Sequence, residues 1–265
     1  MNEYEEITEL YDSIMRHKKA VITIPPFSSF VYSDKVRKPN VFYVSELPYC
    51  VTKIYFHLKY NMQVINNAVI YGRLCHQLLP NLAYECSCYN NAQFEVRVVY
   101  NYDKFIIHGY SDVVLKDSID EWKFTDKSII NRDDNSDNNN NSNNNNNSNN
   151  GNNNRQINII NADSIIHKRN KITAYLMQAN EYAYILNKPK YRVIHVYNNA
   201  LNVYKGNTND IWHNKLINKI ELIYNHFIND KIPDMPPEFE FECKNCPYLS
   251  ICPNKINYNN DDDNQ

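Results

Sequence analysis

Apolar residues follow a helical period in four stretches of this chain. Side chains three and four positions apart share one helix face, so each stretch predicts a helix with one buried side. The stretches are 3–18, 67–82, 172–186 and 210–229. Pro189 ends the third helix, because proline cannot continue a helix. A further helix is expected to begin near Ser45, whose hydroxyl can cap it one residue before Glu46.

The period changes to two between the second and third of these helices, and again after the third. Alternating apolar and polar positions are typical of strands with one buried face. The predicted strands are 94–100, 104–117, 119–124 and 191–199. This order of elements predicts an α/β fold with a small mixed sheet flanked by helices.

Composition narrows the class of protein. The 265 residues are enough for one core, and the four glycines lack the spacing of a nucleotide-binding loop, so a motor or Rossmann enzyme is not expected. The nearly pure Asn stretch at 131–154 predicts a disordered surface insertion. No apolar run approaches a membrane span, and the acidic start does not resemble a signal peptide. We therefore expect a cytoplasmic protein with no membrane partner.

Charge gives no general attraction to nucleic acid, since the formal net charge is −2. A nucleic-acid partner would therefore have to bind a local cluster of basic residues. The alternative is that these basic residues lie in solvated turns. The candidates are Arg97, Lys127, Lys168, Arg169 and Lys171. Tyrosines are abundant, with 22 in the chain, and could stack unpaired bases.

Four of the seven cysteines have the spacing of ligands to one inorganic centre. Cys243, Cys246 and Cys252 form a C-x2-C-x5-C pattern, and Cys50 lies near the other end of the chain. In a reducing compartment such crowding favours metal ligation over disulfides. Zinc and iron are both compatible with four thiolates. The remaining cysteines, at 75, 86 and 88, have no ligand spacing and are expected to be small buried side chains.

A second candidate site combines two acids and a lysine. Glu121 and Lys123 leave the same face of a predicted strand, and a hairpin can bring Asp112 beside them, while Trp122 points into packing. Carboxylate oxygens, with the Trp122 carbonyl, suit Mg²⁺ or Mn²⁺, and this chemistry serves phosphodiester hydrolysis. A solvated edge strand is the alternative.

The surrounding residues resemble the PD-(D/E)xK nuclease superfamily in its RecB-like branch. Asp112, the Glu121–Lys123 pair and the Gln178–Tyr182 pair occur in the family's order, and His76 resembles its upstream metal ligand. Glu95 matches an acid at the start of the first core strand. The resemblance implies a restriction-endonuclease-like core with a mixed central sheet. Its predicted catalytic residues are Asp112, Glu121, Lys123, Gln178 and Tyr182, and its metal ligands His76, Asp112, Glu121 and Trp122.

The cysteine arrangement resembles the iron–sulfur subgroup, which contains the CRISPR-associated RecB-like exonucleases. This implies a [4Fe–4S] cluster in its own lobe, held by Cys50, Cys243, Cys246 and Cys252. It divides the chain into a helical segment (1–43), a nuclease domain (44–253) and a disordered tail (254–265). The implied activity is metal-dependent exonucleolysis of single-stranded DNA in CRISPR spacer acquisition, with integrase proteins as partners. A nuclease of viral or cellular recombination and repair, and a non-catalytic DNA-binding scaffold, remain alternatives.

Overall fold

The computed structural model describes residues 3–18, 28–32, 37–125, 156–165, 171–197, 200–244 and 246–256. The α-helices are α1 (Glu3–Lys18), α2 (Val51–Tyr60), α3 (Asn67–Glu85), α5 (Lys171–Ile185) and α6 (Asp210–Ile228). Three short 3₁₀ turns are η1 (Ser87–Tyr89), η2 (Ala162–Ser164) and η3 (Glu240–Glu242). The strands are β1 (Ser28–Tyr32), β2 (Val41–Tyr43), β3 (Met62–Asn66), β4 (Gln93–Tyr102), β5 (Phe105–Val114), β6 (Ser118–Thr125), β7 (Gln156–Asn161), β8 (Lys190–Tyr197) and β9 (Ala200–Asn207).

A seven-stranded mixed sheet forms the centre of the molecule. Its order is β2-β5-β6-β8-β9-β7, with β4 also paired to β5. The β4–β5, β5–β6 and β8–β9 pairs are antiparallel, whereas β2–β5, β6–β8 and β7–β9 are parallel. The parallel β6–β8 pair requires a crossover, which includes α5. β1 and β3 form a separate antiparallel pair.

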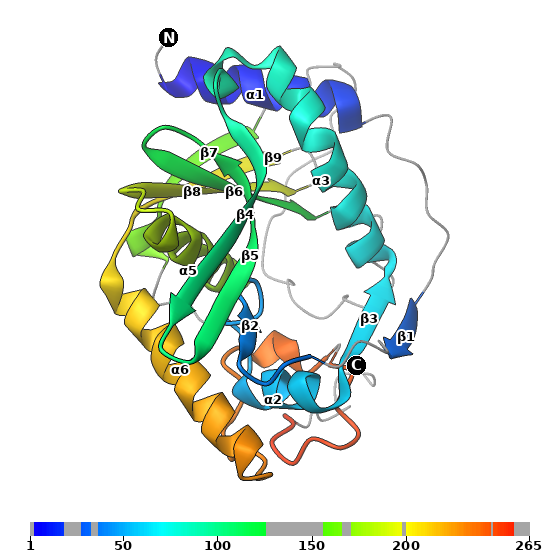
Figure 1. Ribbon diagram of the computed structural model, residues 1–265. Helices are drawn as coiled ribbons and strands as arrows, with labels where there is room; N and C mark the ends of the chain where they lie inside the picture. Colours follow the sequence, from blue (N-terminus) through cyan, green and yellow to red (C-terminus); the bar gives the residue numbers. More distant parts are fainter. Residues whose placement is uncertain are drawn as a thin grey trace.

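Two apolar clusters bury the two faces of this sheet. The larger joins the sheet to α2, α5 and α6, with Phe42, Leu176 and Ile220 fully buried. The smaller joins the opposite face to α1, α3 and η1 around Trp122. Figure 1 shows α1 and α3 at one end of the molecule, and α2 with the C-terminal segment at the other. The strands that carry Asp112, Glu121 and Lys123 are therefore supported by helices on both faces of the sheet.

The elements expected from periodicity are largely confirmed. The helices at 3–18, 172–186 and 210–229 appear within one residue as α1, α5 and α6, and the helix expected at 67–82 extends to Glu85. The helix expected to begin near Ser45 is present as α2, but its predicted start was six residues too early. Residues 44–49 form turns, since the Glu46 carboxylate bonds back to Arg37 and to the Tyr43 N–H, and α2 begins only at Val51.

The sheet is larger than expected. Periodicity did not identify β2, β7 and β9, which widen it, or β1 and β3, which pair outside it. The Asn-rich stretch at 131–154 lies outside the described residues, so its expected disorder stays a prediction. Among the residues that the structure describes, no helix has the length and apolar character to cross a membrane.

Cys86 and Cys88 correct one further expectation. They were expected to be small buried side chains without partners, but they form a disulfide. Their two-residue separation places both sulfurs within reach across η1, where Cα atoms are 5.3 Å apart. Nearby, Glu9 of α1 accepts a hydrogen bond from the Ser87 hydroxyl at 3.0 Å, which joins α1 to this turn.

A buried ion pair supports the sheet behind the candidate site. The Asp120 side chain is fully buried and accepts two hydrogen bonds from Arg192 of β8, at 2.7 and 2.6 Å. The Tyr89 hydroxyl donates a third at 2.8 Å. Asp120 therefore links β6, β8 and η1 with its lone pairs well satisfied.

We predict that Arg192→Met lowers the free energy of unfolding by about 3–5 kcal/mol, because it leaves the Asp120 carboxylate buried without its cation. Urea denaturation measures the change. Lys190→Met, an exposed position on the same strand, is the control and should change stability by less than about 0.5 kcal/mol. The Asp120→Leu/Arg192→Met double variant should recover part of the loss. A loss below about 1 kcal/mol in Arg192→Met would contradict this role for the ion pair.

Candidate metal centre

The β5–β6 hairpin brings Asp112 beside Glu121, as the sequence predicted. Val113 pairs with Asp120 and Val114 with Ile119, so the next position along places Asp112 opposite Glu121. Asp112 Oδ2 also accepts a hydrogen bond of 2.7 Å from the Trp122 backbone N–H. This bond extends the connection between the strands beyond the ladder and orients the Asp112 carboxylate.

Three ligand-type side chains converge at this point. His76, Glu95 and Asp112 each place a nitrogen or oxygen atom within 4.8 Å of the others. His76 Nδ1 lies 3.2 Å from Asp112 Oδ1 and 3.9 Å from Glu95 Oε1. One imidazole and two carboxylates are a donor set suited to a divalent cation such as Mn²⁺.

The three side chains come from different elements. His76 lies on α3, where Pro80 has no N–H to bond the His76 carbonyl four residues earlier. Burial lowers the His76 pKa, but the hydrogen bond and charge of Asp112 outweigh burial and raise it overall. The imidazole therefore pairs directly with the Asp112 carboxylate, and Nδ1 lies 3.2 Å from Oδ1.

Glu95 has an unusual backbone conformation. Its φ of 49° lies in the left-handed region, which non-glycine residues rarely adopt. Phe94 pairs with Val113 and Val96 with Ser111, whereas the intervening pair, Glu95 and Asp112, is missing from the ladder. The strained residue is therefore the one that carries a carboxylate to the triad, a common position for strain at functional sites.

The Glu121 carboxylate lies next to the triad and is buried, with 1% of the residue exposed. Its Oε1 accepts hydrogen bonds from Lys123 Nζ at 2.7 Å and from Gln178 Nε2 at 2.6 Å. Its Oε2 is buried without a hydrogen-bond partner. Such an atom is costly unless something binds it, and a cation would satisfy it. This observation fits the donor set of the triad.

Burial and then the charge of Asp112 raise the pKa of Glu121 to about 7, although Lys123 opposes the shift. Lys123 is affected in the reverse sense: burial lowers its pKa, but the charges of Glu121 and Asp112 outweigh burial and raise it. The Lys123 side chain therefore keeps its positive charge at neutral pH. Its ammonium also lies over the Tyr175 ring, 5.1 Å from the centroid.

Gln178 and Tyr182 lie one turn apart on α5, both facing the sheet. Gln178 contacts Glu121 through the hydrogen bond above. Tyr182 is 2% exposed and packs against Gly109, where an added Cβ would lie 2.5 Å from the Tyr182 hydroxyl. Gly109 is thus needed for the close approach of α5 to β5. Burial, followed by the charge of Glu121, raises the Tyr182 pKa.

The four ligand-type cysteines meet in a separate pocket. Cys50, Cys243, Cys246 and Cys252 line one cavity, together with Glu242, Lys53 and Phe56 among others. None of the four is in a disulfide. Burial raises the Cys50 pKa to about 11, and it also raises that of Cys246 and Cys252. These three thiols therefore favour the protonated form unless a metal binds them.

Hydrogen bonds between distant segments form this pocket. Glu242 accepts from the Cys50 N–H at 2.7 Å and from the Phe239 N–H at 2.9 Å. Lys219 of α6 donates to the carbonyls of Pro48 and Tyr49, at 3.3 and 2.9 Å. The segment around Cys50 is thus held against the C-terminal segment by protein groups as well as by any metal.

The structure brings together His76, Asp112, Glu121, Lys123 and Gln178, as expected, with Tyr182 packed behind them. Trp122 is fully buried in the smaller cluster, and its observed contact with the site is the N–H bond to Asp112, so its carbonyl as a ligand stays a prediction. Glu95 was identified as a family match but not as a ligand. Its position opposite Asp112 in the hairpin could have indicated that role. Of the basic candidates, Lys127, Lys168 and Arg169 lie outside the described residues.

We predict that Mn²⁺ binds the metal-free protein about tenfold more tightly at pH 8 than at pH 6, because at pH 6 the metal must displace a proton from Glu121, whose pKa is about 7. The raised His76 pKa acts in the same direction. The stability of the metal-free protein changes with pH in the opposite direction. The folded chain retains the Glu121 proton to higher pH than the unfolded chain does, so the free energy of unfolding falls as the pH rises from the ordinary glutamate pKa towards 7. Calorimetric titration measures the affinities, and Glu121→Gln should show a weaker pH dependence. Equal affinity at both pH values would contradict the prediction.

Comparison with known proteins supports the fold alone. No protein-family model and no curated protein sequence matches the chain. The structure is similar to the crystal structure of SSO0001, with a TM-score of 0.52 over 95% of this chain and 97% of that one. The two sequences are 16% identical, so the similarity shows a related fold and nothing of function. In this chain that fold is a mixed α/β fold, in which helices flank a seven-stranded mixed sheet.

Proposed function

We propose that this protein is a metal-dependent nuclease that hydrolyses phosphodiester bonds of single-stranded DNA. The observation that carries the proposal is the buried, unpartnered Oε2 of Glu121 beside the His76–Glu95–Asp112 triad and the Lys123 ammonium. A cation held there would make a water more acidic and neutralise charge on the leaving oxygen. Each of the side chains around this cation would have a different role.

The protein groups orient and balance the site. Lys123 supplies a positive charge that can stabilise a phosphoryl oxygen as negative charge develops. Gln178 holds Glu121 Oε1, while Oε2 has no hydrogen-bond partner and is available to a cation. The Trp122 N–H holds Asp112 in the same way. These bonds set the carboxylates before substrate arrives, and such preorganisation is a main source of catalytic power.

The order of these residues along the chain supports a finer description. It resembles the PD-(D/E)xK superfamily in its RecB-like branch, and the same residues converge in space. We therefore propose a restriction-endonuclease-like core acting as an exonuclease. CRISPR spacer acquisition and integrase partners stay predictions from the sequence resemblance.

We also propose that Cys50, Cys243, Cys246 and Cys252 hold a [4Fe–4S] cluster. Four thiols lining one pocket match the number of ligands that such a cluster needs. The cluster would tie the start of α2 to the C-terminal segment, outside the strands that carry Asp112 and Glu121. Its contribution in this proposal is structural.

We predict that Asp112→Asn and Glu121→Gln each lower the rate of DNA cleavage by about 1000-fold or more, because each removes a charge on which metal binding depends. The assay uses single strands labelled at the 5′ or 3′ end, with Mg²⁺ or Mn²⁺. Glu221→Gln, an exposed position on α6, is the charge-matched control and should retain activity. Cleavage of a circular single strand would contradict the exonuclease assignment, and full activity in Glu121→Gln would contradict the site.

We predict that protein purified without oxygen is brown, with broad visible absorption that Cys243→Ser removes. The reason is that iron–sulfur clusters absorb visible light and require their thiolates. Cys75→Ala changes a buried cysteine outside the pocket and should leave the absorption unchanged. Metal analysis completes the test, since a colourless protein containing stoichiometric zinc would reject the cluster.

A further inference from the structure

The β4–β5 hairpin has an exposed face that begins at the metal triad. On β4, Glu95, Arg97 and Val99 occupy alternate positions, and all three are exposed. On β5, Tyr110 pairs with Arg97 and His108 with Val99. Side chains at alternate positions leave the same side of a strand, and a rise of about 3.4 Å per residue carries this row about 14 Å from Asp112 to His108. In Figure 1 the hairpin lies in the foreground, between α5 and α3.

Large apolar surfaces are exposed along this face. Tyr110 is 53% exposed and Val99 is 47% exposed. The neighbouring strand β2 adds Tyr43, which is 40% exposed and pairs with His108 in the sheet, with ring centroids 4.2 Å apart. We call Arg97, Val99, His108, Tyr110 and Tyr43 the hairpin strip.

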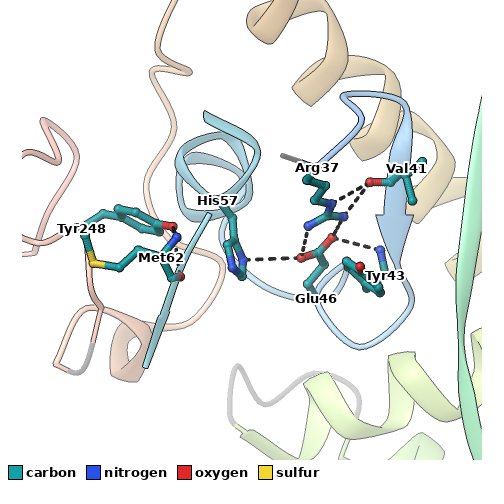
Figure 2. Close-up of polar contacts among 7 residues, drawn as sticks. All are labelled: Arg37, Val41, Tyr43, Glu46, His57, Met62 and Tyr248. Atoms are coloured by element: carbon teal, nitrogen blue, oxygen red, sulfur yellow. Dashed lines mark hydrogen bonds and ion pairs between the residues drawn. The ribbon is translucent and has the colours of Figure 1, made fainter. Parts of the chain in front are cut away.

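A polar network holds Tyr43 in place. Figure 2 shows that Arg37 donates hydrogen bonds to the Val41 carbonyl, at 2.9 and 2.7 Å, and pairs with Glu46. Glu46 in turn accepts from the Tyr43 N–H at 2.9 Å. The Arg37 guanidinium also lies 4.4 Å from the centre of the Tyr43 ring. Because the ring is fixed before a ligand arrives, little entropy is lost when something stacks on it.

The exposed part of the hairpin strip carries a positive charge. Glu46 balances Arg37, but Arg97 forms no ion pair with any of the described residues. His108 lies between these two arginines, and burial followed by their charges lowers its pKa. An exposed guanidinium beside exposed aromatic rings matches the chemistry of unpaired nucleic acid, whose bases stack and whose phosphates are negative.

We propose that the hairpin strip binds the part of the single-stranded DNA substrate that continues from the bond to be cut. Tyr110 stacks on an unpaired base, Arg97 contacts a phosphate, and Tyr43 supports a base farther from the metal centre. This inference rests on the proposed nuclease function and adds to it a defined path for the strand. The strip begins next to Glu95 and Asp112, so this path leads away from the proposed site of cleavage.

The test measures binding separately from cleavage. Full-length protein is titrated, in EDTA, into a fluorescein-labelled oligothymidylate of about 12 nucleotides, and anisotropy gives the Kd. We expect Tyr110→Leu to weaken binding about 5- to 100-fold, since it removes a stacking ring, and Tyr110→Phe to bind within about twofold of the unchanged protein. Arg97→Gln should weaken binding and lower the salt dependence by about one phosphate contact. Tyr60→Leu replaces an exposed tyrosine outside the strip and should have no effect.

A DNA duplex of the same length separates stacking from general attraction. Tyr110→Leu should change the affinity for the duplex by less than twofold, because paired bases do not expose their faces. Unchanged binding of the single strand by Tyr110→Leu, or an equal loss for strand and duplex, would overturn the proposal. Melting temperatures confirm that each variant is folded.

The outcome also distinguishes this inference from the nuclease proposal. A protein that binds through Tyr110 but does not cut DNA with Mg²⁺ or Mn²⁺ supports the strip and refutes the nuclease. A protein that cuts DNA while Tyr110→Leu binds normally supports the nuclease and refutes the strip.

Discussion

The arrangement of the candidate site depends on two buried carboxylates, Asp112 and Glu121, held opposite each other on neighbouring strands. Like charges repel strongly where water is excluded, so this pair would not persist without compensation. The surrounding groups supply it: the His76 imidazole and Trp122 N–H at Asp112, and Lys123 and Gln178 at Glu121. Burial, and after it the charge of Asp112, still raises the pKa of Glu121, and Oε2 of that carboxylate keeps no hydrogen-bond partner. A bound cation would complete the compensation.

Adjacent residues of β6 show how a structural carboxylate differs from a candidate ligand. Asp120 and Glu121 are both buried, but alternation along the strand sends their side chains to opposite faces of the sheet. Asp120 receives hydrogen bonds from Arg192 and Tyr89, which stabilise the fold. Glu121 keeps one oxygen without a partner. The difference in hydrogen bonding, rather than burial or charge, identifies Glu121 as the group open to a ligand.

The two candidate metal sites have different relations to the fold. The triad and Glu121 belong to the β4–β5–β6 part of the sheet and to helices that cover it. The thiol pocket joins the start of α2 to the C-terminal segment, and Glu242 also connects the two. Lys219 of α6 binds the Tyr49 carbonyl just before α2. A cluster in this pocket would strengthen a connection already present, which separates its proposed structural role from the chemistry proposed at Asp112 and Glu121.

The sequence by itself determined the features that depend on local spacing. Helical and strand periods identified α1, α3, α5, α6 and the strands β4, β5, β6 and β8. Alternation placed Glu121 and Lys123 on one face. The tertiary structure decided what depends on distant partners. Strands β7 and β9 gain their places from pairing with each other and with β8, and the Cys86–Cys88 disulfide and the conformation of Glu95 were not predicted. Local patterns report which side of an element is buried, whereas strand pairing, strain and the convergence of ligands depend on contacts between segments that are far apart in the chain.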